Sequence, residues 1–298
     1  MTILISGLIN IETTCRVDGF PIAYNPVNYP FFGVNSTASG VGYNIAKALT
    51  TLSDHIRFCS LIGADLAGEQ VRAELHDDGI NDHYVLAHDG ATAQSVILYD
   101  PDGRRQIYTD LKDLQDRVFP RDAFDHALAG ADLCALCNIN FSRPLLAVAR
   151  RAGVPIATDV HTIGDLNDPY NGEFMAAADI LFMSDEHLPM PPADWARTVI
   201  DRYAPRVLVI GLGATGALLA VPADDFIGII PTRQMRPIVS TIGAGDALFS
   251  AFLHTYTRTG DPYIAIRRAV IFAGWKIGVA SAADGFLRGD ELVEFDNH

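Results

Sequence analysis

Short apolar runs alternate with stretches of helical spacing along most of the chain. The first run, Thr2–Gly7, is apolar and ends in glycine, as expected of a buried parallel strand. Similar runs lie at 56–63, 133–137, 154–158, 180–183 and 207–210, and helical spacing occurs at 45–49, 68–78 and 144–152. This alternation predicts an α/β fold, with a largely parallel central sheet and helices on both faces. No repeat, low-complexity tract or clear linker divides residues 1–298, so we expect a single domain.

Two segments depart from this pattern and predict a small additional sheet. Between residues 91 and 110, apolar and polar positions alternate around the turn Pro101-Asp102-Gly103, which is typical of a β-hairpin. Residues 13–34 are rich in Pro, Tyr, Phe and Asn and lack helical spacing. Together, segments 13–34 and 91–110 predict a small antiparallel β lid, which would exclude water from a reaction beneath it.

A glycine-rich stretch near the C-terminal end combines an anion site with an acidic side chain. The run Ser240-Thr241-Ile242-Gly243-Ala244-Gly245-Asp246 leads directly into an apolar segment of helical spacing. Its glycines allow backbone N–H groups to turn toward one point, and a helix N-terminus attracts negative charge. The stretch therefore predicts a phosphate site, with Asp246 in the first helical turn as a candidate base. The alternative is an ordinary glycine-rich turn capped by Thr241.

Polar residues follow the first strand and open the first helix. Asn10 and Glu12 come just after that strand, at the sheet edge where ligands of α/β proteins usually bind. Gly40 and Gly42 let a ligand approach the backbone where the helix begins, and Asn44 lies in its first turn. We expect Asn44 and Asn10 to face one cleft. For Asn10 and Glu12, capping of a loop is the alternative.

A second glycine run permits a different interpretation. Residues 211–216, Gly-Leu-Gly-Ala-Thr-Gly, match the dinucleotide fingerprint G-x-G-x-x-G. A dinucleotide site needs a helix after these glycines, whereas residues 217–222 are apolar and end in Pro222. It also needs an acidic residue about twenty positions further on, where the chain has Pro231-Thr232-Arg233. We therefore disfavour a nicotinamide or flavin enzyme and expect a glycine turn between two strands, close to a nucleotide.

Composition and charge limit the partners of the chain. Its 298 residues are 49% hydrophobic and 19% charged, as in folded globular proteins. The formal net charge of −14 argues against nucleic-acid binding, because that affinity comes largely from clustered Lys and Arg. No basic leader precedes the first strand and no uncharged apolar run reaches ~20 residues, so we expect no membrane segment. Four cysteines, including Cys134 and Cys137 in an apolar run, indicate reduced thiols and a cytoplasmic location.

Taken in their order along the chain, the motifs resemble those of the ribokinase-like (PfkB) family of sugar and nucleoside kinases, and the resemblance extends over nearly the whole chain. Thr241-x-Gly243-Ala244-Gly245-Asp246 looks like the family signature, and the segments Gly7-x-x-Asn10-x-Glu12 and Gly40-x-Gly42-x-Asn44 are similar to its two substrate-binding segments. The resemblance implies a ribokinase-like fold and an ATP-dependent kinase that transfers the γ-phosphoryl group to a hydroxyl of a sugar or nucleoside. It also implies an anion hole at 243–246, with Asp246 as catalytic base, and Mg²⁺ bound with the ATP.

The resemblance and the positions of side chains together assign further roles. The residues expected to bind the substrate are Asn10, Glu12, Gly40, Gly42, Asn44, Arg104 and Asn138. The residues expected to contact the nucleotide are Gly213, Thr215, Gly216, Thr241 and Ser184, and those expected near magnesium are Asp185 and Glu186. Because lid sheets of this family often pair between subunits, the resemblance also implies a homodimer through the lid.

Three positions depart from the family pattern. Ser240 stands where the family usually has an aspartate tied to a monovalent-cation site, and Glu12 replaces a commoner aspartate. Residues 184–187, Ser-Asp-Glu-His, stand where an Asn-x-x-Glu motif is common. These changes keep an alternative open, a ligand-binding or regulatory protein on the kinase fold that no longer transfers phosphate. The intact Gly-Ala-Gly-Asp run favours the kinase.

Overall fold

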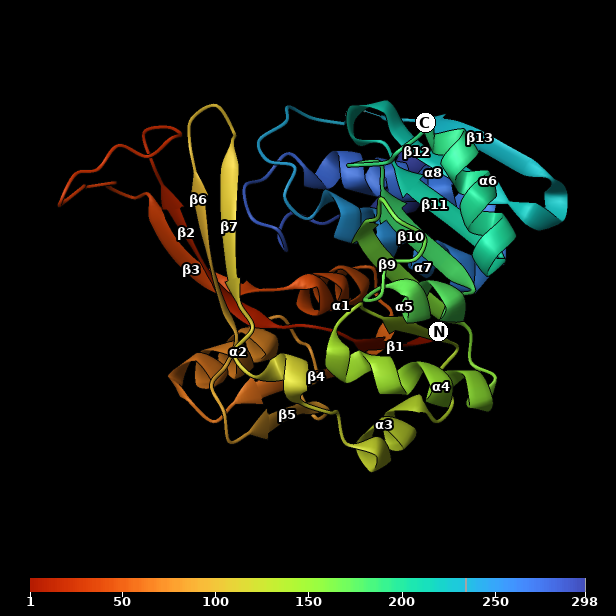
Figure 1. The fold of residues 1–298 in the computed structure, drawn as a ribbon, viewed down its shortest axis with the longest axis horizontal. Coiled ribbons are helices and arrows are strands. Elements are labelled where there is room, and N and C mark those ends of the chain that lie inside the picture. The colour runs from red at the N-terminus through yellow and green to blue at the C-terminus, as the bar shows by residue number, and fades with distance from the viewer. Residues whose placement is uncertain (234, 298) are drawn as a thin grey trace.

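A nine-stranded sheet forms the centre of the protein (Figure 1). The computed structural model describes residues 1–233 and 235–297. The strands of this sheet are β1 Thr2–Ser6, β4 His55–Gly63, β5 Val85–His88, β8 Leu133–Leu136, β9 Ile156–Thr162, β10 Ile180–Ser184, β11 Val207–Gly211, β12 Gly216–Val221 and β13 Phe226–Pro231. They lie in the order β13-β12-β11-β10-β9-β8-β1-β4-β5. β12 and β13 are antiparallel additions at one edge, and the other neighbouring strands pair in parallel.

Helices cover both faces of the central sheet. One face carries α1 Val41–Thr51, α2 Leu66–Asp77, α7 Ala244–Thr259, α8 Pro262–Lys276 and α9 Gly289–Asp296, and the other carries α3 Arg121–Leu128, α4 Arg143–Ala152, α5 Gly172–Ala177 and α6 Pro192–Tyr203. Successive residues of a strand alternate between two cores, so that Ile3 and Ile5 pack with the first group of helices and Leu4 with the second. The predicted α/β fold is therefore confirmed. Among the described residues, no helix has the length and apolar character that a membrane span requires.

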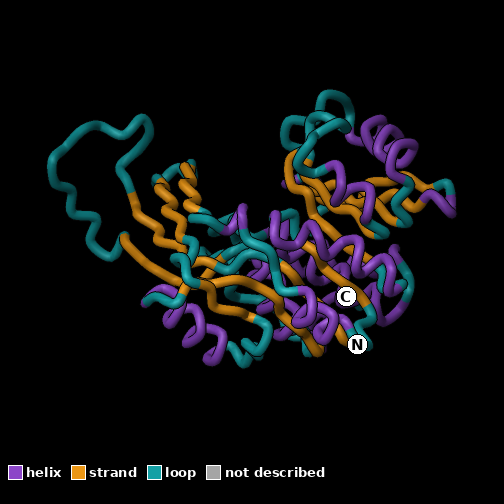
Figure 2. Tube along the Cα trace, turned by 60° about the horizontal axis from the view of Figure 1, so that its bottom comes forward, coloured by secondary structure: helices purple, strands orange, loops and turns teal. Residues whose placement is uncertain are grey.

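A smaller sheet, the lid, stands off the central sheet (Figures 1 and 2). Its strands are β2 Asn10–Arg16, β3 Val34–Ser39, β6 Gln94–Tyr99 and β7 Arg105–Asp110, in the order β3-β2-β6-β7. β6 and β7 form the antiparallel hairpin that the alternation predicts. β2 pairs in parallel with β6, however, so the lid is a mixed sheet and not the antiparallel sheet we expected.

The first lid segment differs in detail from the prediction. Only the two ends of 13–34 belong to strands, because residues 17–33 form a long loop that extends from the lid (Figure 2). Pro21, Pro26 and Pro30 lie in this loop, and proline has no N–H group to donate to a neighbouring strand. The strands therefore begin and end on either side of the proline-containing stretch.

β1 and α1 approach each other at two glycines. A Cβ atom on Gly42 would lie 2.6 Å from the carbonyl carbon of Gly7, and a Cβ on Gly7 would lie 2.5 Å from Cys137 Sγ. Side chains do not tolerate such distances, so glycine at both positions allows α1 to begin directly against the end of β1. This contact holds the N-terminus of α1 at the carboxyl edge of the sheet.

Replacing Gly42 with alanine should destabilise the protein, although alanine is the better helix former. The new Cβ would overlap the backbone of Gly7, and overpacking against backbone costs up to ~3 kcal/mol, more than the ~1 kcal/mol gained in helix propensity. Thermal melting followed by circular dichroism should show a melting temperature several degrees lower. Gly172→Ala in α5 is the matched control, because its Cβ meets nothing closer than 3.9 Å. A Gly42→Ala protein as stable as the Gly172→Ala protein would contradict this explanation.

Candidate active site

The N-termini of two helices meet at the carboxyl edge of the central sheet. α1 and α7 pack against each other, and Asn44 Nδ2 donates a hydrogen bond of 2.7 Å to Asp246 Oδ2. Asn44 is 4% exposed and Asp246 is 9% exposed, so this bond is buried. Both side chains lie in the first turn of their helix, where backbone N–H groups lack intrahelical partners. Two predicted residues, separated by almost the whole chain, are thus brought into contact.

The glycine loop before α7 has a conformation that requires glycine. Gly243 has φ +75°, and a Cβ there would lie 2.3 Å from the carbonyl oxygen of Ala282. Ala244 N–H donates to the Thr241 carbonyl at 3.2 Å, whereas the Thr241 side chain does not cap the helix. Within the described residues, the N–H groups of Gly243 and Gly245 have no backbone partner. The loop therefore presents free donors at a helix N-terminus, which is what an anion site needs.

Burial and neighbouring charges act in opposite directions on Asp246. Removal from water raises the pKa of its carboxyl group, and the hydrogen bond from Asn44 lowers that pKa. The charges of His161 and Lys276 also lower the pKa, whereas the charge of Asp159 raises it. A carboxylate whose pKa is raised is a better proton acceptor than an exposed aspartate, and the nearby positive charges favour its ionised form.

The lid supplies the second side of the site. Asn10 and Glu12, which we expected just past the carboxyl end of β1, lie on lid strand β2. Ser39 Oγ donates to Glu12 Oε2 at 3.1 Å, and Asn10 Nδ2 donates to Ser95 Oγ at 2.8 Å. Burial raises the pKa of Glu12, the bond from Ser39 lowers it, and the charge of Asp246 raises it. Ser39 directly precedes Gly40 and α1, and Asn44 of α1 bonds to Asp246, so the start of α1 links Glu12 on the lid strand to Asp246 after the glycine loop.

The glycines at the start of α1 shape this space. Gly40 has φ +108°, and a Cβ there would lie 2.7 Å from the Leu8 carbonyl oxygen and 2.9 Å from Asn10 Oδ1. Gly42 packs on Gly7 as described above. Both glycines thus hold β1, β2 and α1 in close contact, which places Asn10 beside the helix that carries Asn44.

The second glycine run forms a turn between two strands, as predicted. Residues 213–215 make a short 3₁₀ turn, and β12 follows it in place of the helix that a dinucleotide site requires. Gly216 has φ +115°, and a Cβ there would lie 2.1 Å from the Ile230 carbonyl oxygen. A Cβ on Gly213 would meet nothing within 4 Å. The turn, which includes Thr215, therefore has unobstructed space beside its backbone at Gly213, at the same sheet edge as the glycine loop.

The residues expected near magnesium follow the end of β10. Asp185 N–H donates to the Gly211 carbonyl at 3.0 Å, and Glu186 N–H donates to Ser184 Oγ at 3.2 Å, so the backbone is fixed while both carboxylates stay exposed. No group of three or more metal-binding side chains occurs in the described part of the chain. Mg²⁺ commonly takes one or two carboxylates with phosphates and waters, and these residues fit that mode of binding.

Two expected substrate residues have partners of their own. Arg104 Nη2 forms an ion pair with the buried Asp100 at 2.7 Å, in the turn of the β6–β7 hairpin. Asn138 Nδ2 donates to Asn171 Oδ1 at 2.9 Å. Substrate binding by Arg104 and Asn138 therefore stays a prediction.

Sequence reasoning missed three charged residues that influence the site. Asp159 and His161 lie on β9, and Lys276 ends α8; the charges of all three act on Asp246. Asp159 directly follows the apolar run 154–158, which is the kind of signal that identified Asn10. Lys276 carries no such signal, because it follows an apolar run in a helix that also contains Arg267 and Arg268.

Cys134 and Cys137 are free and buried. Burial raises the pKa of the Cys134 thiol to about 12, so the reactive thiolate is strongly disfavoured.

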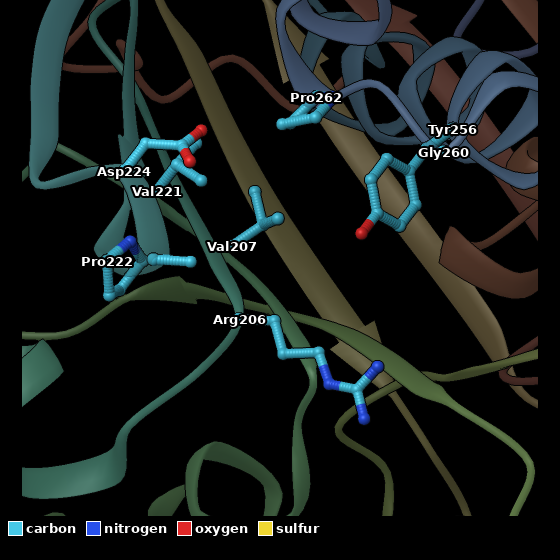
Figure 3. Close-up of a pocket in the computed structure, with 9 residues that line it drawn as sticks. Arg206, Val207, Val221, Pro222, Asp224, Tyr256, Gly260 and Pro262 are labelled. Atoms are coloured by element: carbon cyan, nitrogen blue, oxygen red, sulfur yellow. The ribbon is translucent and has the colours of Figure 1, made fainter.

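A cavity of about 320 Å³ lies at the opposite edge of the sheet (Figure 3). It is lined by the start of β11, the end of β12 and the turn between α7 and α8. Its charged groups already have partners, because Arg206 Nε pairs with Asp179 at 3.3 Å and Tyr263 donates to Asp224 at 2.7 Å. None of the predicted site residues lines this cavity.

Comparison with known proteins connects this geometry to a family. The model of the pfkB family of carbohydrate kinases matches residues 2–287. An ATP-dependent ribose-1-phosphate kinase from Halopiger xanaduensis is 27% identical over 277 residues, covering 91% of this chain and 88% of that protein. The match therefore spans the lid, the glycine loop and the sheet between them.

Solved structures share the fold over the whole chain. A microbiome-derived acarbose kinase superposes with a TM-score of 0.89 at 22% identity, covering 100% of this chain and 99% of that one. A ribokinase from Thermotoga maritima gives a TM-score of 0.81 at 20% identity, again covering 100% and 99%. The chain belongs to the pfkB family of carbohydrate kinases, has the ribokinase-like fold and is a phosphotransferase with an alcohol group as acceptor.

Proposed function

We propose that the protein transfers the γ-phosphoryl group of ATP to a hydroxyl group of a sugar or nucleoside. The hydrogen bond of 2.7 Å between Asn44 and Asp246 supports this most directly. It joins α1, which begins beside the proposed acceptor-binding residue Asn10, to α7, which begins at the glycine loop. A base for the acceptor and an anion site for the transferred group therefore lie together.

In the proposed reaction, Asp246 takes the proton of the acceptor hydroxyl. The hydroxyl oxygen bonds to the γ-phosphorus while the bond to the bridging oxygen of ADP breaks, and ADP leaves with that electron pair. The free N–H groups of Gly243 and Gly245, in the anion hole expected at 243–246, stabilise the negative charge on the transferred group, and they are fixed in place before the reaction. Mg²⁺ bound with ATP would neutralise phosphate charge, and Asp185 or Glu186 would hold its waters.

The proposed acceptor is a neutral, polyhydroxylated molecule. Asn10, Glu12 and Asn44 offer amide and carboxylate groups that pair with hydroxyls. Within the described residues, the buried Asn44 Oδ1 has no hydrogen-bond partner, so it is free to accept one from a hydroxyl. The carboxylates of Glu12 and Asp246 would repel a phosphorylated acceptor. The name of the Halopiger relative, in contrast, indicates a sugar phosphate as its acceptor.

The lid is proposed to pair with the lid of a second copy. Val34, Val96 and Tyr108 lie on one face of the lid according to its register, and they are 55%, 41% and 52% exposed. A second lid covering this face would remove apolar surface from water, which favours association. The protein would then act as a homodimer.

Replacing Asp246 with asparagine should lower turnover by ~100- to 10,000-fold, the usual contribution of a general base. A coupled ADP-release assay at saturating acceptor measures turnover, and calorimetry should show ATP binding close to that of the wild type. Asp122→Asn, at an exposed carboxylate in the first turn of α3, is the matched control and should keep full activity. Near-normal turnover in Asp246→Asn would exclude Asp246 as the base. A wild-type protein that releases no ADP with any acceptor would favour the regulatory alternative.

A thermal-shift screen should identify the acceptor class. With an ATP analogue and Mg²⁺ present, we expect neutral pentoses, hexoses or nucleosides to raise the melting temperature more than their phosphates do. Glu12→Gln should raise the acceptor KM by about tenfold or more, because a hydrogen bond to a charged group contributes ~1.5–3 kcal/mol, and should leave the KM for ATP unchanged. A larger shift with sugar phosphates would overturn the proposal of a neutral acceptor.

Light scattering should give the wild type a mass twice that of the 32.3 kDa chain. The double variant Val96→Asp, Tyr108→Asp should be monomeric, because two charges would be buried at the lid face. Ile229→Asp is the control, since Ile229 is 55% exposed on β13 of the central sheet and should not affect association. A monomeric wild type, or a double variant that stays dimeric, would contradict pairing through this face.

A further inference from the structure

Lys276 is a buried cation next to the glycine loop. Its side chain is 0% exposed, and it is the last residue of α8. Its ammonium group donates a hydrogen bond to the carbonyl oxygen of Ile242, the residue directly before Gly243. Among the described residues, no carboxylate lies within ion-pair distance of it. A fully buried ammonium group bound to a neutral carbonyl is an unusual arrangement.

Packing alone does not account for a lysine at this position. Burying an ammonium group without a paired carboxylate is unfavourable, and an apolar side chain of similar length would fill the same volume at lower cost. Burial lowers the pKa of Lys276 to about 8, while the charges of Asp246 and Asp284 raise it. The amine is therefore still largely protonated at neutral pH, and its positive charge is retained despite the cost.

The contact fixes one peptide group of the phosphate loop. The Ile242–Gly243 peptide is trans, so its C=O and N–H groups point in opposite directions. An ammonium group bound to the carbonyl oxygen therefore directs the Gly243 N–H away from Lys276, and it polarises that N–H as a donor. The next residue, Ile277, holds the same loop, because its carbonyl accepts from Val239 N–H at 2.8 Å and from Ser240 N–H at 3.0 Å.

We propose that Lys276 is a positioning residue for phosphoryl transfer: its ammonium group locks the Ile242–Gly243 peptide and supplies a positive charge behind the loop that receives the transferred group. This inference rests on the proposed function of that loop. The charge comes from the protein itself, and the ammonium group is held on the carbonyl oxygen of Ile242. The protein therefore does not need potassium for this purpose.

Lys276→Met tests the role of the ammonium group, because methionine is similar in length and has neither charge nor N–H donor. We expect turnover to fall about tenfold or more with the acceptor KM within about twofold. We also expect the Kd of the β,γ-imido analogue of ATP to rise about tenfold and that of ADP to change less than about twofold. Val270→Ala, at a buried residue of α8, should lower stability without changing these values.

Several results would overturn the inference. Unchanged turnover in Lys276→Met, or equal weakening of ADP and the ATP analogue, would reduce Lys276 to a structural residue. Wild-type turnover that is higher in potassium chloride than in tetramethylammonium chloride of equal ionic strength would also contradict it. If Lys276→Met does not fold, Lys276→Gln replaces it, because glutamine keeps an N–H donor without the charge. Absence of phosphoryl transfer in the wild type would overturn the proposed function alone, since the two Kd values still test Lys276.

Discussion

The buried hydrogen bond between Asn44 and Asp246 is the contact on which the arrangement of the site depends. It forms because the N-termini of α1 and α7 are held together at the sheet edge, where Gly42 packs on Gly7 and Gly243 packs on Ala282. Without the donor from Asn44, Asp246 would be a buried carboxylate lacking its main hydrogen-bond partner, which is strongly unfavourable. The same bond aligns Asp246 with the helix that begins beside the lid strand, so the proposed acceptor and phosphate residues share one geometry.

An anionic nucleotide must bind to a protein with a formal net charge of −14. Surface charge therefore opposes binding, and the favourable potential has to be local. It comes from free N–H groups at the start of α7, from the dipole of that helix, and from the ammonium group of Lys276 behind the loop. These groups are fixed by the fold, and the burial of Lys276 makes its charge more effective than that of a surface lysine.

The sequence predicted the structural features that depend on neighbouring residues. The apolar runs predicted the central strands, and the Gly-Ala-Gly-Asp run predicted the glycine turn that opens α7, because glycine conformation and helix starts depend on neighbouring residues. The position of Asn10 and Glu12 on β2 was not predictable in this way, since that strand pairs in parallel with β6, far along the chain. The ion pair that holds Arg104 depends likewise on how the hairpin turn closes on Asp100. Contacts formed only in the folded chain determine both the strand position of Asn10 and Glu12 and the ion pair of Arg104.

The sequence departure at Ser240 and the presence of Lys276 have a common physical explanation. A carboxylate ligand strengthens the binding of a free cation, whereas a cation attached to α8 is held at the site by the helix itself. Ser240 is neutral, and its Oγ accepts the N–H of Ile242 at 3.2 Å, so it supports the loop without adding charge. An aspartate at 240 would place another carboxylate next to a loop that must receive a phosphoryl group. The ammonium group of Lys276 binds the carbonyl of Ile242 and places a positive charge behind the loop. Ser240 is neutral and does not offset that charge.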